Sequence, residues 1–493
     1  MSTPRPVSRS LLWIVLCGAL FLAGCARPAP PSASQELHLV VVHSNDTHSY
    51  LAGRDKYGNA CLASAECVGG LPRMATAIKD AKDAKDAKGR GDNVLVLDAG
   101  DQFQGTLFYT AGKWPMLADI NTLMPYDAMT LGNHEFDDGC EDAASFVKAL
   151  SFPVVAANLD PQPGCPLHGA PYHPWIIREV RGVKVAVVGL ANPDVCTLAA
   201  ACPQTHFTDS AATLRKAVTD LERQGVRHIV ALTHLGLPED RALARSVDGV
   251  DIIVGGHTHT YLGEGSKDGP YPVVEYAPSG QPVLVVTAAY AAEYLGELEV
   301  TFDASGVPRQ WQGAARRLDA SVTPDAAVEA KVAAHARELE RFRAVPLGRN
   351  DLEYADGIEA CRRGECLGGL VVADAMLEAG RPYGAEIAIL NGGSLRAPLK
   401  RGELTRGDVL SVLPFGNALV LRQYSGEQLL AALEHGVAGE GGVGPRLLHV
   451  AGLRYGFDPT QPPGRRLQWA TLTDGRGAHG AHGARRAVDK TGQ

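Results

Sequence analysis

The sequence predicts two α/β domains joined by a helix. The chain has 493 residues, more than a single hydrophobic core usually organises. From residue 37 to about 315, short apolar runs rich in Val and Ile alternate with helical stretches, as expected for strands buried on both faces. Residues 324–343 then repeat Ala, Glu, Arg and Lys with a helical period, and a second α/β series begins at Val345. We therefore expect a layered α/β domain, a connecting helix and a smaller α/β domain.

The expected elements follow one another in a regular order. In the first domain we expect strands at 39–43, 94–97, 154–157, 183–189, 228–233, 251–254 and 283–287. Helices fit between these strands, for example at 71–88 and 211–224. In the second domain we expect a helix at 370–378, a strand at 386–390 and a helix at 427–435. The corresponding limits are 37–320 for the first domain, 321–344 for the connecting helix and 345–493 for the second domain.

The first residues are typical of an export signal. Arg5 and Arg9 precede an apolar run at 11–22, which is too short to span a bilayer comfortably. The run ends in Leu-Ala-Gly-Cys, which resembles a bacterial lipobox with Cys25 as the lipidated residue. Residues 1–25 are therefore expected to be a lipoprotein signal peptide, and the Pro/Ala/Ser-rich stretch within 26–36 a flexible tether. The alternative is a simple secretory signal with an incidental cysteine. The lipobox favours an exported periplasmic or cell-surface lipoprotein, held to the membrane only by its lipid anchor.

The cysteine pattern agrees with export. Besides Cys17 and Cys25 the chain has an even set of eight: Cys61, Cys67, Cys140, Cys165, Cys196, Cys202, Cys361 and Cys366. In an exported protein such a set predicts disulfides. Three pairs are close in sequence, at 61/67, 196/202 and 361/366, so that Cys140 and Cys165 are left for each other. No pair has the Cys-x-x-Cys spacing of a metal or redox site, so structural bridges are the better interpretation.

The charge of the chain limits its partners. A formal net charge of −8 argues against a nucleic-acid polymer, because binding many phosphates requires a basic surface. A mononucleotide or a nucleotide sugar is compatible with this charge, since a few arginines suffice to bind one.

Polar residues of the metal-binding kind follow the expected strands. They occur in five blocks, which are Asp46-Thr47-His48, Gly100-Asp101, Gly132-Asn133-His134-Glu135, Thr233-His234 and Gly255-Gly256-His257-Thr258-His259. The carboxyl ends of parallel strands meet at one edge of a sheet, where α/β proteins form their sites. A single His or Asp in a loop is usually only a solvated residue, but an ordered series of five blocks predicts a metal centre.

The residue types indicate the chemistry. Two divalent ions about 3.5–4 Å apart can clamp a phosphoryl group and activate a bound water. A bridging carboxylate offsets the repulsion between two such ions. Mixed carboxylate, amide and imidazole ligands suit Mn, Zn, Co or Fe. A further His outside the metal set can stabilise developing charge or protonate the leaving oxygen.

The blocks resemble the motifs of calcineurin-like metallophosphoesterases, and LDAGDQFQGTLFYT and YDAMTLGNHEFDDG resemble the 5′-nucleotidase branch. The resemblance runs from about 37 to 459 and implies a four-layer αββα first domain and a smaller nucleotide-binding second domain. It implies two divalent ions and seven ligands, which are Asp46, His48 and His259 for the first ion, Asn133, His234 and His257 for the second, and Asp101 as the bridge. It also implies that His134, paired with Asp137, is the catalytic dyad.

The second half resembles the nucleotide-binding domain of the same family. The segment 361–366 matches one whose first arginine contacts substrate, and 391–396 matches a glycine-rich motif in which Ser394 replaces a glycine. Residues 414–417 match a Pro-Phe-Gly-Asn loop whose aromatic ring stacks on the base. The resemblance thus implies a substrate site formed by Arg362, Asn391, Gly393, Arg396, Phe415 and Asn417. Residues 475–493 depart from the family, being rich in Gly, Ala, Arg and His, and we expect the second domain to be incomplete after about 474.

The resemblance implies an enzyme that removes the 5′-phosphate from nucleoside monophosphates, with nucleotide sugars or NAD as further substrates. Three alternatives stay open at this point. They are a 2′,3′-cyclic nucleotide phosphodiesterase or UDP-sugar hydrolase, a thiosulfohydrolase of sulfur oxidation, and a catalytically impaired nucleotide-binding surface lipoprotein. The base preference, the native metals and the oligomeric state are equally open.

Overall fold

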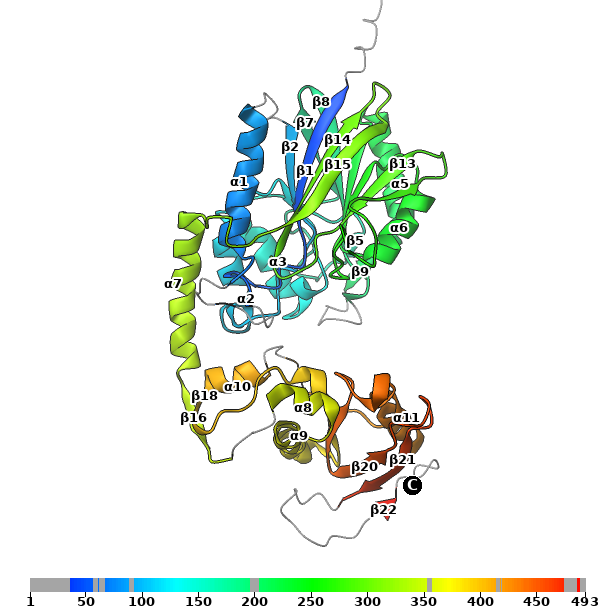
Figure 1. Cartoon of the computed structure of the whole chain (residues 1–493). Helices are drawn as coiled ribbons and strands as arrows, with labels where there is room; N and C mark the ends of the chain where they lie inside the picture. The colour runs from blue at the N-terminus through cyan, green and yellow to red at the C-terminus, as the bar shows by residue number, and fades with distance from the viewer. Residues whose placement is uncertain are drawn as a thin grey trace, which may run out of the picture.

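The chain folds into two lobes connected by one long helix, as the computed structural model shows (Figure 1). The structure describes residues 36–55, 61, 67–87, 93–195, 204–352, 357–413, 417, 419–473 and 486–487. The first lobe ends with β15 (Pro308–Arg317), and the second lobe follows α7 (Ala326–Arg343). Within the described residues, no helix combines the length and apolar composition that crossing a membrane requires.

Two β-sheets lie face to face in the first lobe. One has the strand order β15-β14-β1-β2-β3-β4-β6 and the other the order β12-β13-β11-β10-β8-β7. The strands of the first sheet, besides β15, are β1 (Leu37–Ser44), β2 (Val94–Asp98), β3 (Ala128–Met129), β4 (Val154–Val155), β6 (Tyr172–His173) and β14 (Tyr294–Phe302). Those of the second are β7 (Trp175–Val180), β8 (Val183–Leu190), β10 (His228–Thr233), β11 (Ile252–Val254), β12 (Val273–Tyr276) and β13 (Pro282–Val286). A separate small pair consists of β5 (Leu159–Pro161) and β9 (Thr205–Phe207).

The alternation of side chains along each strand explains the layers. On β1, Leu39 and Val41 join the core between the two sheets, whereas Val40 and Val42 on the opposite face join the core beneath the helices. The second sheet behaves alike, since β8 contributes Val187 to the core between the sheets and alternate residues to its own helix layer. Both sheets are therefore apolar on both faces, as the continuous apolar runs predicted.

Helices cover the outer face of each sheet (Figure 1). The first sheet is covered by α1 (Leu71–Ala87) and α2 (Leu107–Asn121), and the second by α5 (Ser210–Arg223) and α6 (Leu237–Ser246). A further helix, α3 (Cys140–Ala149), packs with β4 in a smaller core. The result is the four-layer αββα arrangement, which confirms the predicted fold class.

The connecting helix α7 is fixed to the first lobe. The side chain of Asp325 caps its start by accepting hydrogen bonds from the backbone N–H groups of Ala327 and Val328. Its buried residues are spaced at three and four positions, as required for one apolar face, and are Val328, Val332, Ala336 and Leu339. They join the core of α1 and α2. The helix coincides with the one expected at 324–343.

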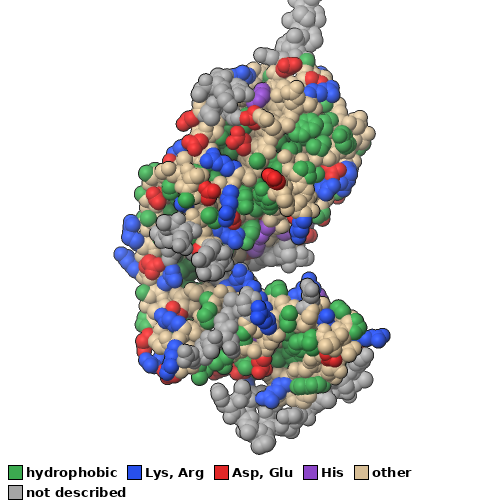
Figure 2. Space-filling view, in the orientation of Figure 1, with side chains coloured by type: hydrophobic (Ala, Val, Ile, Leu, Met, Phe, Trp, Pro, Cys, Tyr) green, Lys and Arg blue, Asp and Glu red, His purple; other side chains and the backbone are tan. Residues whose placement is uncertain are grey.

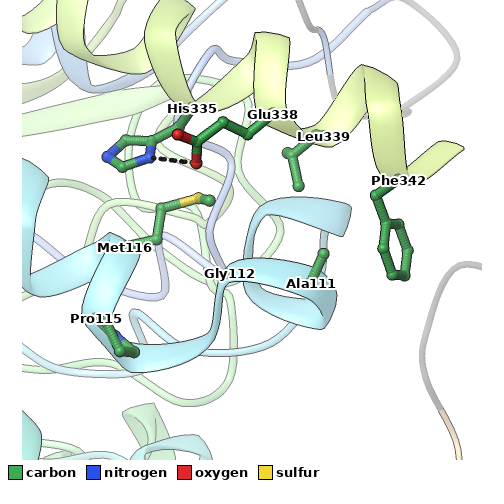
Figure 3. A pocket seen from close by; sticks show the side chains of 8 residues that line it. All are labelled: Ala111, Gly112, Pro115, Met116, His335, Glu338, Leu339 and Phe342. Atoms are coloured by element: carbon green, nitrogen blue, oxygen red, sulfur yellow. Dashed lines mark ion pairs between the residues drawn. The ribbon is translucent and has the colours of Figure 1, made fainter.

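A cavity of about 330 Å³ opens between α2 and the later turns of α7 (Figure 3). It is lined by Ala111, Gly112, Pro115 and Met116 from α2 and by His335, Glu338, Leu339 and Phe342 from α7. Phe342 lies at the end of this wall, where the guanidinium carbon of Arg406 in the second lobe is 4.3 Å from its ring centroid. The last turn of α7 thus contacts both lobes.

The second lobe contains smaller sheets and cores. Its helices are α8 (Gly357–Arg363), α9 (Leu367–Gly380), α10 (Arg406–Val412) and α11 (Gly426–Gly436). Its strands pair as β16 (Pro346–Asn350) with β18 (Gly402–Thr405), as β17 (Ala388–Asn391) with β19 (Leu448–Ala451), and as β20 (Leu453–Phe457), β21 (Leu467–Leu472) and β22 (Arg486–Ala487). The short 3₁₀ turns of this lobe are η3 (Arg381–Tyr383), η4 (Gly392–Ser394) and η5 (Glu440–Gly442), whereas η2 (His134–Phe136) belongs to the first lobe. The strands and helices named from the sequence are present in both lobes, although β4 is shorter than expected.

One buried histidine makes the fold sensitive to acid. His43 near the end of β1 is fully buried, its Nε2 lies 2.8 Å from the hydroxyl of Tyr271, and its Nδ1 has no hydrogen-bond partner among the described residues. Burial lowers the pKa of His43 to about 3, from 6.5 in a free side chain. The unfolded chain therefore takes up the proton first. The free energy of unfolding should fall as the pH drops from about 6.5 towards 3, by up to about 5 kcal/mol from this group.

Replacing His43 by Gln should flatten this dependence. Urea unfolding of the metal-free protein between pH 7 and pH 4 gives the slope of the free energy of unfolding against pH. His206→Gln is the control, because His206 is exposed and should leave the slope unchanged. An unchanged slope in His43→Gln would mean that other groups dominate acid unfolding.

Candidate metal centre and active site

Five loops meet at one edge of the two sheets. They follow β1, β2 and β3 of the first sheet and β10 and β11 of the second, and within each sheet these strands are parallel. The carboxyl ends of the strands therefore lie on the same side, and backbone hydrogen bonds join the loops directly. The N–H of Asp46 donates to the carbonyl of Gly100 (2.9 Å), and that of His48 to the carbonyl of Asp101 (3.0 Å).

Asp46, His48 and His259 form the first group of side chains. Their ligand-type atoms all lie within 4.8 Å of one another. The Nε2 atoms of His48 and His259 are 2.8 Å apart, and the Oδ1 atom of Asp46 is 3.9 Å from the first and 3.5 Å from the second. These are the three residues expected to hold the first ion.

Asp101, His234 and His257 form the second group, again within 4.8 Å. His234 is fully buried, and its Nε2 lies 2.9 Å from Oδ2 of Asp101. Asn133 is also buried, and its Oδ1 has no hydrogen-bond partner among the described residues. A buried carbonyl oxygen without a donor is costly unless a cation or a water satisfies it, so this atom fits a metal ligand.

Asp101 connects the two groups. It belongs to a third set with His48 and His134, and its Oδ1 accepts the backbone N–H of His134 at 2.8 Å. Burial alone would raise the pKa of Asp101, but the charge and hydrogen bond of His234 hold it well below its ordinary value. The loop passes close to this carboxylate only because position 132 is glycine, where an added Cβ would lie 2.0 Å from Oδ1. The carboxylate therefore lies within reach of both groups.

The ligand loops have an unusual backbone. Five of the seven expected ligands have positive φ values, which are 48° for Asp46, 47° for His48, 55° for Asp101, 78° for His257 and 53° for His259. Such values are unfavourable for residues that carry a Cβ. Surrounding hydrogen bonds hold them in place. The Nδ2 of Asn45, for example, donates to Asp46 Oδ2 (2.7 Å) and to the carbonyl of Ala289 (2.6 Å).

His134 and Asp137 form a pair beside the metal groups. They are three residues apart across the 3₁₀ turn η2, and the Nδ1 of His134 lies 2.8 Å from Oδ2 of Asp137. Because a carboxylate only accepts, Nδ1 carries the proton and Nε2 is the ring nitrogen left for chemistry. Burial would lower the pKa of His134, but this hydrogen bond and the charges of Asp101 and Asp137 raise it to about 9.

Other residues supporting this site were not predicted. The buried carboxylate of Glu135 accepts backbone N–H groups from Asp101 (3.0 Å), Gln102 (2.7 Å) and Gly132 (2.7 Å), so it joins two ligand loops. Asp138, next to Asp137, accepts from Lys113 Nζ (2.9 Å), which lies at a break in α2 where φ is 53°. Glu135 lies in one of the five polar blocks, but the sequence did not show that its side chain is completely buried, and this burial is what indicates its supporting role.

The expected substrate residues lie on the second lobe. Arg362 lies in the last turn of α8, Asn391 ends β17, and Gly393 lies in the turn η4. Backbone and side-chain contacts with Pro445 hold this turn, including Asn391 Nδ2 to the carbonyl of Pro445 at 3.1 Å. Asn417 is exposed, and Phe415 lies outside the described residues.

One residue of this surface contributes to the electrostatics of the first lobe. Burial raises the pKa of Tyr50, which follows the first ligand block, and the charge of Arg396 acts in the opposite direction. Arg396 belongs to the second lobe, whereas Tyr50 belongs to the first. Figure 2 shows histidines at the lower edge of the first lobe, opposite Lys and Arg side chains of the second.

The cysteine pairing differs from the prediction in part. The structure places Cys61 and Cys67 at a disulfide distance of 1.99 Å, and Cys361 and Cys366 at 2.04 Å. Cys140 is disulfide-bonded while Cys165 has a free, buried thiol, so the expected bridge between these two is wrong. The Sγ atoms of Cys140 and Cys165 lie 3.1 and 3.5 Å from the hydroxyl of Thr205, so the two cysteines are close in space although they are not bonded to each other. Cys25, Cys196 and Cys202 lie outside the described residues.

Comparisons with known proteins agree with this architecture. Residues 39–261 match the family model of calcineurin-like phosphoesterases, and residues 348–477 match that of the 5′-nucleotidase C-terminal domain. The chain is 34% identical to a snake venom 5′-nucleotidase from Naja atra, over 87% of this chain and 83% of that protein. It is 33% identical to a 5′-nucleotidase from Rattus norvegicus, over 92% and 80% of the two chains. Among solved structures, it resembles a 5′-nucleotidase precursor from Thermus thermophilus, with 37% identity, a TM-score of 0.69 and coverage of 92% and 88%.

Proposed function

We propose that this chain, which belongs to the 5′-nucleotidase family of calcineurin-like phosphoesterases, uses the loop residues at its sheet edge to remove the 5′-phosphate from nucleoside monophosphates. The family assigns it to the nucleotide phosphohydrolases. The observation that best supports the residue roles is the shared carboxylate of Asp101, which lies within reach of both groups of histidines. We further propose domain limits at 37–320 and 345–493, with the connecting helix between them.

The residues present fit two divalent ions. Calcineurin-like phosphoesterases are dinuclear metal enzymes, and the unpaired Oδ1 of Asn133 together with the closely spaced Nε2 atoms of His48 and His259 suits cations better than protons. We assign Asp46, His48 and His259 to one ion, Asn133, His234 and His257 to the other, and Asp101 to both. The mixed donors favour Mn, Zn, Co or Fe.

When bound, two such ions hold the phosphoryl oxygens and activate a water for in-line attack. The protein's own residues carry out the rest. Asp137 keeps the proton of His134 on Nδ1, and Nε2 faces the reacting group. In its protonated form, His134 stabilises the charge that develops and donates a proton to the departing ribose oxygen. Glu135 keeps the loops of Asp101 and Asn133 at a fixed separation.

The second lobe supplies nucleotide recognition in this proposal. Arg362 and Arg396 suit a phosphate or carboxylate because the planar guanidinium donates paired hydrogen bonds. Asn391, Gly393 and Asn417 line the same surface, and Phe415 stacks on the base. The substrate then lies between the lobes, with its phosphate at the sheet edge and its base on the second lobe.

Export is proposed from a separate set of observations. The apolar leader with Cys25 resembles a lipoprotein signal, and two cysteine pairs lie at disulfide distance. Disulfides persist in oxidising compartments. We propose a periplasmic or cell-surface lipoprotein that reaches the membrane through its lipid alone.

One experiment separates the candidate activities. The hydrolysis products of AMP, UDP-glucose, 2′,3′-cyclic AMP and NAD are separated and quantified with the purified protein and added Mn or Co. Chromatography is used because the first cleavage of the last three substrates releases no inorganic phosphate. Preference for AMP supports the proposal. Preference for the cyclic nucleotide or for UDP-glucose would make the chain a phosphodiesterase or a nucleotide-sugar hydrolase. The absence of turnover with bound metal would indicate a binding protein.

Phe415→Ala should weaken nucleotide binding without altering the metal chemistry. Loss of base stacking is worth about 1–3 kcal/mol, so KM for AMP should rise by about 5- to 150-fold, while hydrolysis of p-nitrophenyl phosphate stays near that of the unmodified chain. Tyr383→Ala is the control, because Tyr383 is the most exposed of the described large hydrophobic residues and lies in the same lobe. An equal effect on both substrates would mean that Phe415 is not part of a base site.

A further inference from the structure

We propose that Tyr290 is a positioning residue that fixes the plane of the His259 imidazole at the first metal group. The proposal rests on the role of His259 as a metal ligand, which belongs to the proposed function. Tyr290 was not among the residues expected from the sequence. It acts through His259 and does not itself bind the metal.

Two of the ligand histidines are oriented by the backbone. Nδ1 of His48 lies 3.1 Å from the carbonyl of Phe103, and Nδ1 of His234 lies 2.6 Å from the carbonyl of Ala99. Because a carbonyl only accepts, each Nδ1 donates its proton, which leaves Nε2 as the ligand atom and fixes the ring orientation. Metal-binding histidines commonly need such a second partner.

His259 differs from both in its surroundings. Among the described residues, its ring contacts His48 and Asp46, both through Nε2, and its Nδ1 has no partner. Its side chain is 39% exposed, compared with 8% for His48 and 0% for His234. An imidazole without a hydrogen bond on its far nitrogen, and with this much exposure, is free to rotate about its Cβ–Cγ bond unless another group holds it.

The ring of Tyr290 is placed to hold it. Its centroid is 4.6 Å from that of His259 and the two planes differ by 8°, which is a parallel stack. A stacked ring opposes rotation of the imidazole because turning would break the contact on that face. The stacked ring therefore orients the imidazole of His259, as a backbone carbonyl orients those of His48 and His234.

The loop of Tyr290 is tied to the ligand loops. The residues around it have positive φ values, which are 57° at Ala289, 62° at Ala291 and 54° at Ala292. The N–H of Ala289 donates to the carbonyl of Thr260 (2.9 Å), and that of Ala291 to the carbonyl of Asp46 (2.8 Å). The loop is thus joined to both segments that carry the first metal group. A strained loop with these contacts presents the ring in one position.

A second contact restrains Tyr290 itself. The guanidinium carbon of Arg54 is 5.3 Å from the ring centroid, within the range of a cation–π interaction. Arg54 is held by an ion pair with Glu293 (3.2 Å) and by backbone pairing with Val68, which follows the Cys61–Cys67 bridge. The contacts of His259, Tyr290, Arg54 and Glu293 therefore form one continuous series that begins at the metal group.

The test measures metal binding, not turnover alone. The full chain is freed of metal with a chelator and titrated with Co²⁺, followed by calorimetry and by the visible spectrum of the bound ion. Tyr290→Leu should lower the affinity for one of the two Co²⁺ ions by about 10-fold, which is the lower end of the range for residues that orient ligands. It should also alter the visible spectrum of that ion. Tyr290→Phe keeps the stacked ring and should bind both ions as the unmodified chain does. Tyr276→Leu, at an exposed tyrosine on β12, is the matched control and should have no effect.

The outcomes separate this proposal from the ligand assignment. His259→Ala should lose one ion, and if it keeps both, the assignment of His259 as a ligand fails. If His259→Ala loses an ion but Tyr290→Leu binds both normally, the positioning role is wrong. If Tyr290→Phe is as weak as Tyr290→Leu, the hydroxyl and not the stack is responsible, which also overturns the proposal. A raised KM for AMP in Tyr290→Leu with unchanged metal binding would make Tyr290 a substrate contact instead.

Discussion

Replacing Asp101 by Asn is expected to remove most of the bound metal and to reduce kcat for AMP by much more than 100-fold. The carboxylate belongs to a set with His48 and to a set with His257, and its Oδ2 lies 2.9 Å from Nε2 of His234. An amide lacks the negative charge that offsets the repulsion between two divalent ions. Changes in residues that only support ligands typically cost about 10–100-fold, and loss of a shared ligand should exceed that. Metal content by mass spectrometry and phosphate release from AMP measure both effects.

Asp98→Asn is the matched control for this variant. Asp98 is buried three residues earlier at the end of β2, where it accepts hydrogen bonds from the Ser44 hydroxyl (2.6 Å) and the N–H of Gly100 (3.1 Å). Burial raises its pKa to about 6, unlike that of Asp101. An amide can still accept at this position, so the metal should stay. If Asp101→Asn keeps two ions and turns over normally, the bridging assignment is wrong.

His134→Asn should keep both ions and slow the chemical step by about 10²–10⁴-fold, the usual range for an acid–base group. The reason is geometric, because Nδ1 of His134 is engaged with Asp137 (2.8 Å), and the side chain lies beside Asp101 and His48 without belonging to either three-residue ligand group. Single-turnover measurements with AMP and the metal content of the same sample check this expectation. Loss of metal in His134→Asn would make this residue a ligand.

Two comparisons sharpen the result for His134. Asp137→Asn should keep the metals and reduce kcat less than His134→Asn, because it removes the partner that holds the tautomer and not the proton donor. p-Nitrophenyl phosphate should be less affected than AMP in His134→Asn, since p-nitrophenolate departs without a proton more easily than a ribose oxygen. Equal losses for both substrates would favour charge stabilisation over proton donation as the role of His134.

The fold class and the groups of site residues could be predicted because both depend on local patterns. Apolar runs with a block of polar residues after each one describe buried strands and the loops that follow them. Parallel strands then bring Asp46, Asp101 and His234 to one edge whatever the distance between them in sequence. The edge strands could not be predicted in this way. The strand β14 pairs antiparallel with β1, which lies more than 200 residues away in the sequence, and β15 is placed at the edge only through its pairing with β14.

The supporting residues were missed for a related reason. Glu135, Asn45 and Tyr290 act through contacts between loops, and nothing in their local sequence shows those contacts. The error at Cys140 and Cys165 has the same origin. These two cysteines were paired only because the other six were assigned to close neighbours in the sequence, and closeness in sequence does not determine which sulfurs meet in the folded protein. The expected ligands belong to motifs, whereas the residues that support them depend on the packed structure.

The positive φ values around the site have a consequence for the lifetime of the protein. Within the described part of the chain, every non-glycine residue in this conformation lies in the ligand loops or the Tyr290 loop, apart from Lys113 and Arg181. Each such residue costs about 1 kcal/mol or more, and together they approach the net stability of a typical domain, about 5–15 kcal/mol. A bound ion favours the folded state in proportion to the logarithm of its concentration. If the proposed ions bind, the supply of free metal should set how often the loops open to a protease, and so how long each molecule survives.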